Sequence, residues 1–203
     1  MASIQGAEAH TAPEVVDGRL ARSARTRRAI VDALRSLHHD GDLLPTAPRV
    51  AERAGVSVRT VWQHFDDLEM LFVAAGERDL EIAMTFLTPI DAGLPLPARI
   101  ELLVEQRSQM YEEMAPVWRA ARLKAPFSPQ LRINRDRMVR LGRQQLERLF
   151  ATELATAASA PDLLSALEVV SGWAAWECMR AELDLDVPAA RAALELTLRR
   201  LTT

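Results

Sequence analysis

The chain has 203 residues, of which 49% are hydrophobic and 26% charged, and its formal net charge at pH 7 is −3. This composition suits one small and one medium globular domain, and the negative charge argues against indiscriminate binding to nucleic acid. The single cysteine, Cys178, excludes a disulfide framework and fits a reducing compartment. No apolar run is long enough to span a membrane, and residues 1–18 lack the apolar centre of a signal peptide. We therefore expect a cytoplasmic protein without a membrane partner.

Residues 1–18 carry acids and a proline, which predicts a disordered N-terminal arm. A long helix is expected over 20–40. Between Arg19 and Phe65 there are nine arginines against four acids, a local net charge of +5 in an acidic chain. Such a concentration of positive charge indicates phosphate contacts, although a solvated basic helix face has the same composition.

The adjacent stretch 46–65, TAPRVAERAGVSVRTVWQHF, favours the phosphate interpretation because it has the spacing of two short helices joined by a tight turn. Gly55 stands where the first helix must stop, and Ser57 is a suitable N-cap for the second. Val58, Val61 and Phe65 recur at the spacing of that helix's inner face. The remaining positions, which contain no acid, are expected to face outward: Arg59, Thr60, Trp62, Gln63 and His64.

These outward side chains suit the chemistry of double-stranded DNA. The Gln63 amide can bind adenine bidentately, and Arg59 can read guanine or hold a phosphate. Trp62, His64 and the more distant Thr46 fit phosphate anchoring, while Arg25 and Arg27 can join them or enter the minor groove. The full predicted DNA-binding set is Arg25, Arg27, Thr46, Ser57, Arg59, Thr60, Trp62, Gln63 and His64.

The same residues carry a resemblance to the TetR family of bacterial transcriptional regulators. Residues 26–33 resemble that family's first helix, Gly41 and Thr46 its glycine turn and helix-capping threonine, and residues 50–65 its helix-turn-helix, in order and without a gap. The sequence departs from the family pattern at Trp62, where a tyrosine is usual, and at Leu68, where a lysine is usual. Acids surround Leu68, so we expect one phosphate contact to be missing.

The rest of the chain shows helical spacing and no strand alternation. Helices are expected over 47–54, 58–64, 67–87, 97–114, 116–124, 128–157, 161–183 and 188–201. The fold class is therefore all-α, with about nine helices. We divide it into the arm (1–18), a three-helix DNA-binding domain (19–66) and a helical effector-binding and dimerisation domain (67–203), with helix 67–87 touching both folded parts.

Seven of the ten aromatic residues lie from Phe86 onward. At helical spacing they fit an ordinary core, but the resemblance implies an effector pocket among the middle helices, and aromatic and methionine linings suit an apolar ligand. The predicted effector-binding residues are Met84, Met110, Tyr111, Met114, Trp118, Arg122, Phe127, Trp173, Trp176 and Glu177.

The last two expected helices are amphipathic. Packing within one chain explains this pattern, whereas the resemblance implies pairing with a second copy in a twofold four-helix bundle. A dimer also places two reading helices on one palindrome. The predicted interface residues are Leu167, Val170, Ser171, Ala174, Cys178, Leu194, Leu198 and Leu201.

Sequence motifs for catalysis are missing, with no P-loop, nucleophile elbow or dinucleotide fingerprint. His38, His39 and Asp40 have the residue types of a metal site, but their positions fit a helix end and the following turn better. We expect a non-enzymatic, DNA-binding repressor with no cofactor or metal, released from a palindromic operator by a small apolar or amphipathic effector. The alternatives are a related helical protein without operator function, acting in ligand binding or scaffolding, and a helical enzyme using Glu177 and Arg180.

Overall fold

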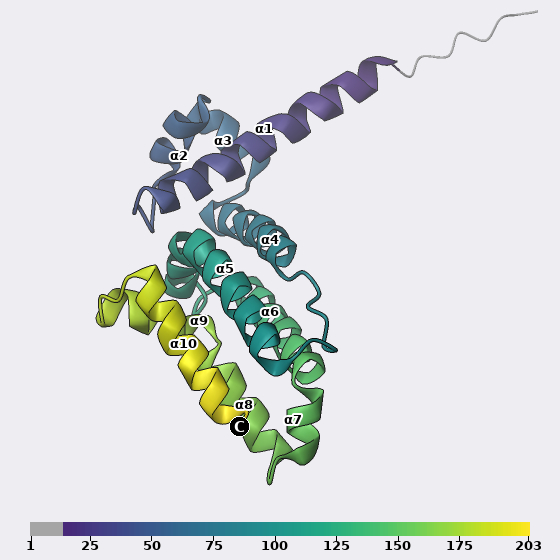
Figure 1. The fold of residues 1–203 in the computed structure, drawn as a ribbon. Helices are drawn as coiled ribbons and strands as arrows, with labels where there is room; N and C mark the ends of the chain where they lie inside the picture. The colour runs from purple at the N-terminus through teal and green to yellow at the C-terminus, as the bar shows by residue number, and fades with distance from the viewer. Residues whose placement is uncertain (1–13) are drawn as a thin grey trace, which may run out of the picture.

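The computed structural model describes the backbone of residues 14–203 and side chains from residue 18. Every regular element in this range is helical (Figure 1). The elements are α1 (Glu14–His39), α2 (Ala47–Ala54), α3 (Val58–His64), α4 (Leu68–Phe86), α5 (Leu96–Lys124), α6 (Pro129–Leu149), α7 (Ala151–Thr156), α8 (Ala160–Val170), α9 (Trp173–Glu177), the π-helical turn η1 (Cys178–Glu182) and α10 (Val187–Leu201). None of the described helices has the length and apolar character that crossing a bilayer requires.

The first three helices form a small unit at one end of the molecule (Figure 1). Its core joins the inner faces of α1, α2 and α3 through Ile30, Leu34, Val50 and Val61. Helix α1 begins at Glu14, so the arm predicted over residues 1–18 is too long at its C-terminal end. Residues 1–13, where the rest of that arm was predicted, lie outside the described residues.

Helix α4 contributes to two separate cores. Leu71, Phe72 and Ala75, in its first half, belong to the core of the N-terminal unit. Ala83, near its end, belongs to a second core that α5, α6, α8 and α10 enclose. A displacement of α4 would therefore disturb both cores at once, since packed interiors have little free volume to absorb it.

Helix α5 is the central helix of the second core, with α4, α6 and α10 packed around it (Figure 1). The predicted break between 97–114 and 116–124 is wrong, because α5 continues through Pro116 to Lys124. Proline removes one helical hydrogen bond. On either side of it, Met114 and Val117 are buried in the second core, and this packing favours a continuous helix.

The two long helices predicted over 128–157 and 161–183 are each interrupted. The first divides at Phe150 into α6 and α7. The second divides at Ser171 and Gly172 into α8 and α9, followed by η1. The Ser171 hydroxyl donates to the Leu167 carbonyl at 2.6 Å, and a Cβ added to Gly172 would lie 2.8 Å from the Glu168 oxygen. Glycine is therefore required for the close approach at this break.

Candidate nucleic-acid interface and effector site

Helix α3 is held by its caps and by a narrow apolar face. The Ser57 hydroxyl accepts a hydrogen bond from the Thr60 backbone N–H at 3.0 Å, as its predicted N-cap role requires. Gly55 ends α2 with a φ of 67°, the left-handed conformation expected there. Val61 and Phe65 are buried, whereas Val58 is 36% exposed. The prediction that Val58 lies on the inner face is therefore wrong, because α3 meets the core only from its second turn.

The predicted DNA-binding residues stand on the surface. Arg59, Trp62 and Gln63 are exposed on α3, whereas Thr60 and His64 are half-buried at its flanks. The hydroxyls of Thr60 and Ser57 lie 2.8 Å apart and are hydrogen-bonded to each other. Thr46 occupies the N-cap position of α2, but its side chain makes no capping hydrogen bond. Its exposed hydroxyl is thus available to another partner.

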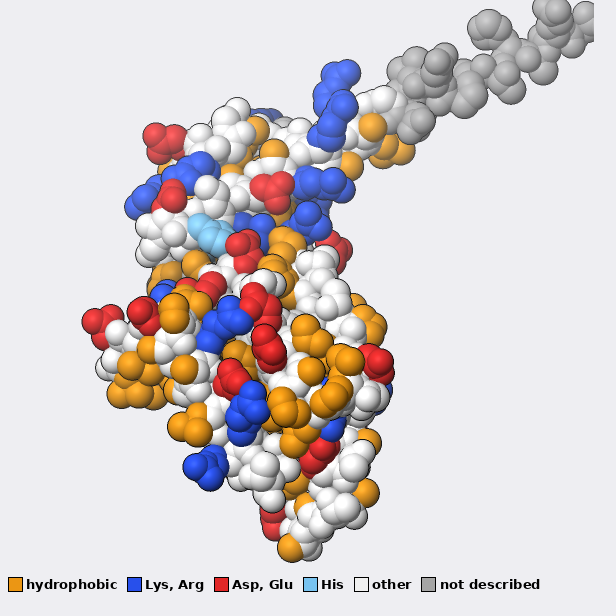
Figure 2. Space-filling model, viewed as in Figure 1, with side chains coloured by type: hydrophobic (Ala, Val, Ile, Leu, Met, Phe, Trp, Pro, Cys, Tyr) orange, Lys and Arg blue, Asp and Glu red, His pale blue; other side chains and the backbone are white. Residues whose placement is uncertain are grey.

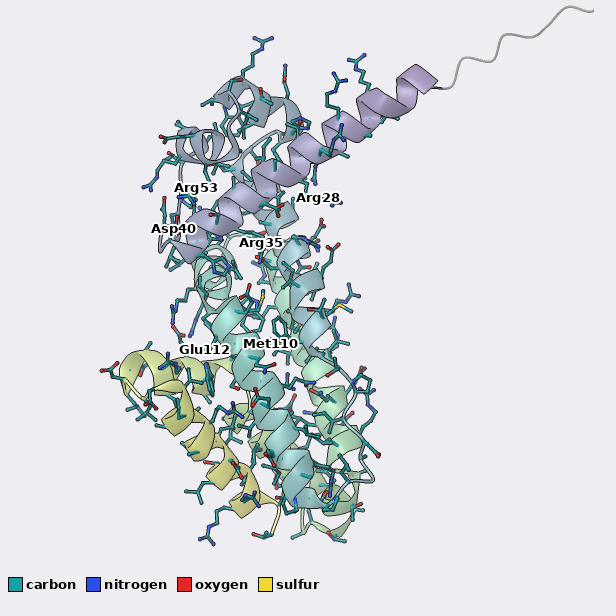
Figure 3. The ribbon with its side chains drawn as sticks, turned by 45° about the horizontal axis from the view of Figure 1, so that its top comes forward. Arg28, Arg35, Asp40, Arg53, Met110 and Glu112 are labelled. Carbon is teal, nitrogen blue, oxygen red and sulfur yellow. The ribbon has the colours of Figure 1, made fainter. Side chains whose placement is uncertain are left out.

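The arginines of this unit fall into two groups. Arg35, Arg49 and Arg53 form ion pairs with Asp79, Asp42 and Asp40, respectively. Figure 3 shows Arg53 and Asp40 side by side. Six others are exposed and pair with no acid among the described side chains: Arg19, Arg22, Arg25, Arg27, Arg28 and Arg59. Five of these lie on α1 between residues 19 and 28, where basic side chains stand out in Figure 2.

Arg27 links this basic stretch of α1 to the end of α3. Its guanidinium carbon lies 4.7 Å from the centroid of the buried Phe65 ring, in cation–π geometry. The contact fixes the guanidinium beside the C-terminal end of α3 and leaves the side chain exposed. An arginine held in this way can bind a phosphate with a smaller loss of side-chain entropy.

The start of α4 differs from the rest of this surface. The Asp67 carboxylate accepts a hydrogen bond from the Met70 backbone N–H at 2.8 Å and so caps α4. Leu68 packs against the N-terminal core, and Asp66 and Glu69 are exposed. This corner carries negative charge, as expected from the sequence, and it is a poor phosphate site.

Three contacts join helices α1, α4 and α5. Arg35 of α1 pairs with the buried Asp79 of α4. The His38 ring stacks on Phe72, with centroids 5.7 Å apart, and the Lys124 ammonium lies 5.0 Å from the centroid of the same Phe72 ring. Phe72 thus joins the end of α1 to the end of α5 through α4.

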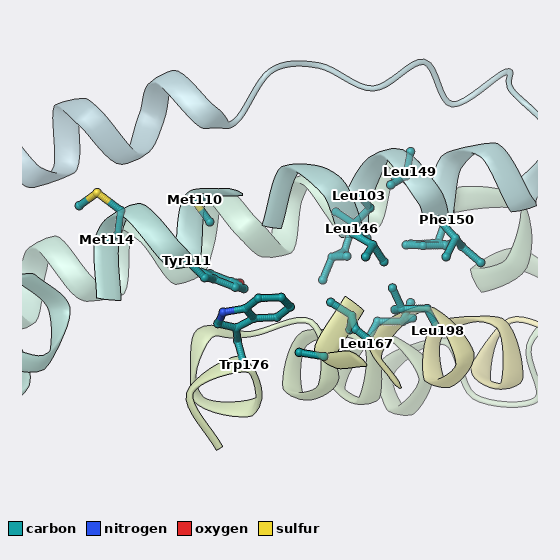
Figure 4. Packing of buried hydrophobic residues seen from close by; sticks show 14 of the residues in the cluster. Leu103, Met110, Tyr111, Met114, Leu146, Leu149, Phe150, Leu167, Trp176 and Leu198 are labelled. Atoms are coloured by element: carbon teal, nitrogen blue, oxygen red, sulfur yellow. The ribbon is translucent and has the colours of Figure 1, made fainter. Parts of the chain in front are cut away.

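The predicted effector residues gather partly into one aromatic cluster, which we define as Tyr111, Trp118, Trp173 and Trp176. Tyr111 and Trp176 are buried, whereas Trp118 and Trp173 are partly buried. Tyr111 lies 5.8 Å from Trp118 and 6.1 Å from Trp176, and Trp118 lies 5.8 Å from Trp173, all between ring centroids. Met110 and Met114 of α5 are buried in the same core (Figure 4). These rings contact one another, so a ligand that enters between them must displace them.

Other members of the predicted set lie elsewhere. Phe127 is 81% exposed at the turn between α5 and α6, and Met84 is exposed on α4. Arg122 lies over the Trp173 ring at 5.9 Å. Glu177 forms a bidentate pair with Arg119, at 2.7 and 2.9 Å. An enzyme using Glu177 with Arg180 has no support in this geometry, because Arg180 pairs with Glu112 instead.

The sequence prediction missed a buried polar layer between α5 and α6. Gln145 donates to the Gln106 oxygen at 2.6 Å, and Gln106 donates to the Thr88 carbonyl at 2.8 Å. Arg107 is also buried, and its Nε and the Gln145 Oε1 have no hydrogen-bond partner among the described residues. One signal was available, because Arg107 interrupts an otherwise apolar stripe that runs from Leu103 to Met114.

The predicted interface set is divided by burial. Leu167, Ser171, Leu194 and Leu198 are buried within the single chain, so their assignment to a dimer surface is corrected: they join α8 and α10 to α5. The others remain partly or fully exposed: Val170, Ala174, Cys178 and Leu201. In the part of the chain that the structure describes, no group of three or more His, Cys, Asp or Glu side chains is placed to hold a metal ion.

Solved structures resemble this chain along most of its length. A transcriptional regulator from Rhodococcus sp. Rha1 superposes with a TM-score of 0.68 at 20% identity, covering 88% of this chain and 95% of its own. A TetR transcription regulator from Haloarcula marismortui gives 0.62 at 18% identity, covering 88% and 97%. The multidrug binding protein EbrR, complexed with imidazole, gives 0.62 at 18% identity, covering 87% and 94%. No protein-family model and no curated protein matches the sequence.

The geometry defines a helix-turn-helix unit joined through α4 to a helical core domain. The structural matches place this architecture among known folds: the chain has the fold of the TetR-family transcriptional regulators. The fold implied by the sequence resemblance is thereby confirmed, as is the all-helical class.

Proposed function

We propose that the protein is a cytoplasmic, non-enzymatic repressor that binds a palindromic DNA operator as a homodimer and is released by a small effector. The observation that carries this proposal is the acid-free outer face of α3 beside six arginines of α1 and α3 that pair with no acid among the described side chains. These groups supply both a base-reading helix and the phosphate contacts that position it. A protein kept only for ligand binding or scaffolding has no need of such a surface.

The release mechanism follows from α4. An effector that enters the second core displaces α4, which also packs in the N-terminal core and is tied to α1 by the Arg35–Asp79 pair. In a dimer this displacement alters the separation of the two α3 helices. The effector acts only through its different affinities for the DNA-competent and DNA-incompetent separations.

Selection of bound duplexes from a random DNA pool, at two salt concentrations, tests the function. A palindrome whose binding weakens steeply with salt is expected, because each neutralised phosphate releases counterions. Weak, sequence-blind binding would instead favour the ligand-binding or scaffolding alternative, for which the acids around Leu68 are the supporting feature.

Two variants separate base reading from phosphate binding. Gln63→Ala should cost about 1–3 kcal/mol on the selected operator and relax preference at one base position. Arg27→Ala should weaken binding to all sequences and lower the salt slope by about 1. Fluorescence anisotropy with operator and scrambled duplexes distinguishes them. A Gln63→Ala protein with unchanged sequence preference would remove Gln63 from the base-reading set.

The dimer proposal rests on apolar side chains that remain exposed on α8 and α10. Val169 is 72% exposed and Leu196 58% exposed, and the two helices pack against each other in the chain. We expect Val169→Glu/Leu196→Glu to shift the protein from dimer to monomer in sedimentation experiments, because it buries charge in the twofold contact. Ile133→Glu, on the exposed face of α6, is the control and should remain dimeric.

A further inference from the structure

The buried face of α5 carries a cation without a counter-charge. Arg107 is 4% exposed, and its Nε is buried with no hydrogen-bond partner among the described residues. Arginine cannot relieve the cost of burial by losing its proton, because the guanidinium stays charged in proteins. An isolated charge in such a place is unfavourable unless an anion joins it.

The acids around α5 do not fill this role. Glu105 pairs with Arg191, Glu112 with Arg180, and Glu177 with Arg119. The two remaining acids of α5, Glu101 and Glu113, are exposed. The other buried arginine of this helix, Arg99, already has Glu153 as its partner. Of the two buried arginines of α5, Arg99 therefore has an ion-pair partner, and Arg107 has none among the described residues.

Arg107 also adjoins the aromatic cluster. It lies one helical turn before Tyr111, where burial raises the pKa of the Tyr111 hydroxyl and the neighbouring Arg107 guanidinium opposes that rise. On the other side, a Cβ added to Gly142 of α6 would lie 3.4 Å from the guanidinium. A second buried donor of the cluster, the Trp173 indole N–H, likewise has no acceptor among the described residues. The cluster therefore offers donors and apolar surface together.

From these contacts we propose that Arg107 binds the carboxylate of an amphipathic organic acid whose apolar body lies against the aromatic cluster. The guanidinium fork matches a carboxylate in bidentate geometry, and a single unpaired cation balances a single negative charge. A phosphate ester, with up to two charges, would leave one unbalanced. This inference rests on the proposed function in taking the second core as the effector site, and it names the chemical class of the effector.

Entry of the acid requires the wall formed by α8, α9 and η1 to move. Hydrogen bonds and ion pairs hold this wall to α5: the Tyr111 hydroxyl donates to the Ser171 carbonyl at 2.6 Å, and the Trp176 indole donates to Glu112 at 2.8 Å. The Arg119–Glu177 and Arg180–Glu112 ion pairs add to these contacts and must also yield. The Tyr111 hydrogen bond ends at the break between α8 and α9, and η1 follows α9 directly. Helix breaks and π-helical turns are places where a helix can shift its register at low cost.

The test uses tryptophan fluorescence in a Trp62→Tyr background, because the three other tryptophans all belong to the aromatic cluster. The probes are decanoate and 2-naphthoate, each beside its uncharged methyl ester. We expect at least one acid to bind about tenfold or more tightly than its ester, as a charge-assisted hydrogen bond requires. Arg107→Met should bring that acid and its ester to within about threefold, and Arg107→Lys should reduce the preference. Arg140→Met, an exposed α6 arginine, should retain it.

Several results would overturn the proposal: no binding of either acid, equal binding of acid and ester by the parental protein, or an unchanged preference in Arg107→Met. Should Arg107→Met fail to fold, the parental preference and its reduction in Arg107→Lys decide the question. These measurements need no DNA. If an operator is selected but its binding responds equally to acid and ester, the proposed regulator function stands and the proposed carboxylate site is wrong. If the protein prefers the acid but no operator is selected, the carboxylate site stands and the regulator function is wrong.

Discussion

Replacing Asp79 with alanine is expected to lower the free energy of unfolding by about 3–5 kcal/mol, the usual cost of removing one partner from a buried ion pair. The Asp79 side chain is 9% exposed and the Arg35 side chain 13% exposed, and a second Arg35 nitrogen is buried with no hydrogen-bond partner among the described residues. The substitution leaves the guanidinium at the junction of α1 and α4 with no compensating charge. Urea unfolding followed by circular dichroism measures the loss.

Two further variants assign this loss to the unpaired charge. Arg35→Met/Asp79→Leu removes both charges and should recover most of the stability, because apolar pairs of similar volume replace buried ion pairs well. Glu81→Ala breaks the exposed Arg78–Glu81 pair on the same helix and should change stability by only about 0–1 kcal/mol. A loss in Asp79→Ala no larger than that of Glu81→Ala would mean that solvent already screens the Arg35–Asp79 contact.

The double variant also separates stability from signal transmission. Because it restores packing while removing the charged link between α1 and α4, we expect a stable protein whose DNA affinity responds less to effector. Such a result agrees with a coupling carried by a defined contact between two cores. The stacked contact of His38 on Phe72 remains in this variant, so some response should persist.

The elements that could be predicted from the sequence are those fixed by neighbouring residues. Helices α2 and α3 have the predicted bounds, since Gly55 and Ser57 determine where one ends and the next begins through local backbone geometry and capping. Pro116 misled the prediction for the opposite reason. Its local effect is to break a helix, but the buried residues on both sides of it belong to a core assembled from distant helices.

The candidate site divides in the same way. The outward residues of α3 could be assigned because a short capped helix has one inner face, and Val61 and Phe65 mark it. The interface residues could not, since an amphipathic pattern shows that Leu194 and Leu198 are buried without showing which chain buries them. The burial of Arg35 and Arg107 could not be predicted, because the sequence does not distinguish a buried arginine from an exposed one. Residues of α4 and α6, distant in the chain, form their surroundings.

The stability of the protein should fall as the pH is lowered from about 6.5 to about 4, and His38 should account for up to about 3 kcal/mol of that fall. Burial lowers the pKa of His38 from 6.5 to about 4, against an opposing effect of Asp42, while the nearby charges of His39 and Arg35 add to the lowering. In this pH range the unfolded chain binds a proton at His38 that the folded chain does not. The stabilisation is therefore complete above pH 6.5 and is lost as the pH approaches 4.

His38→Leu tests this origin directly. The ring nitrogens of His38 make no hydrogen bonds among the described residues, so an apolar replacement leaves no polar group unsatisfied at the Phe72 contact. Urea unfolding at several pH values should give a flatter profile for His38→Leu than for the parental protein. His39→Gln, which removes the exposed neighbour, is the matched control and should retain most of the parental pH dependence, because burial is the larger cause of the His38 shift. If the free energy of unfolding of His38→Leu depends on pH as steeply as that of the parental protein, other groups cause the acid sensitivity. A flattened slope would establish that protonation of one buried ring loosens the contact through which α1 meets α4.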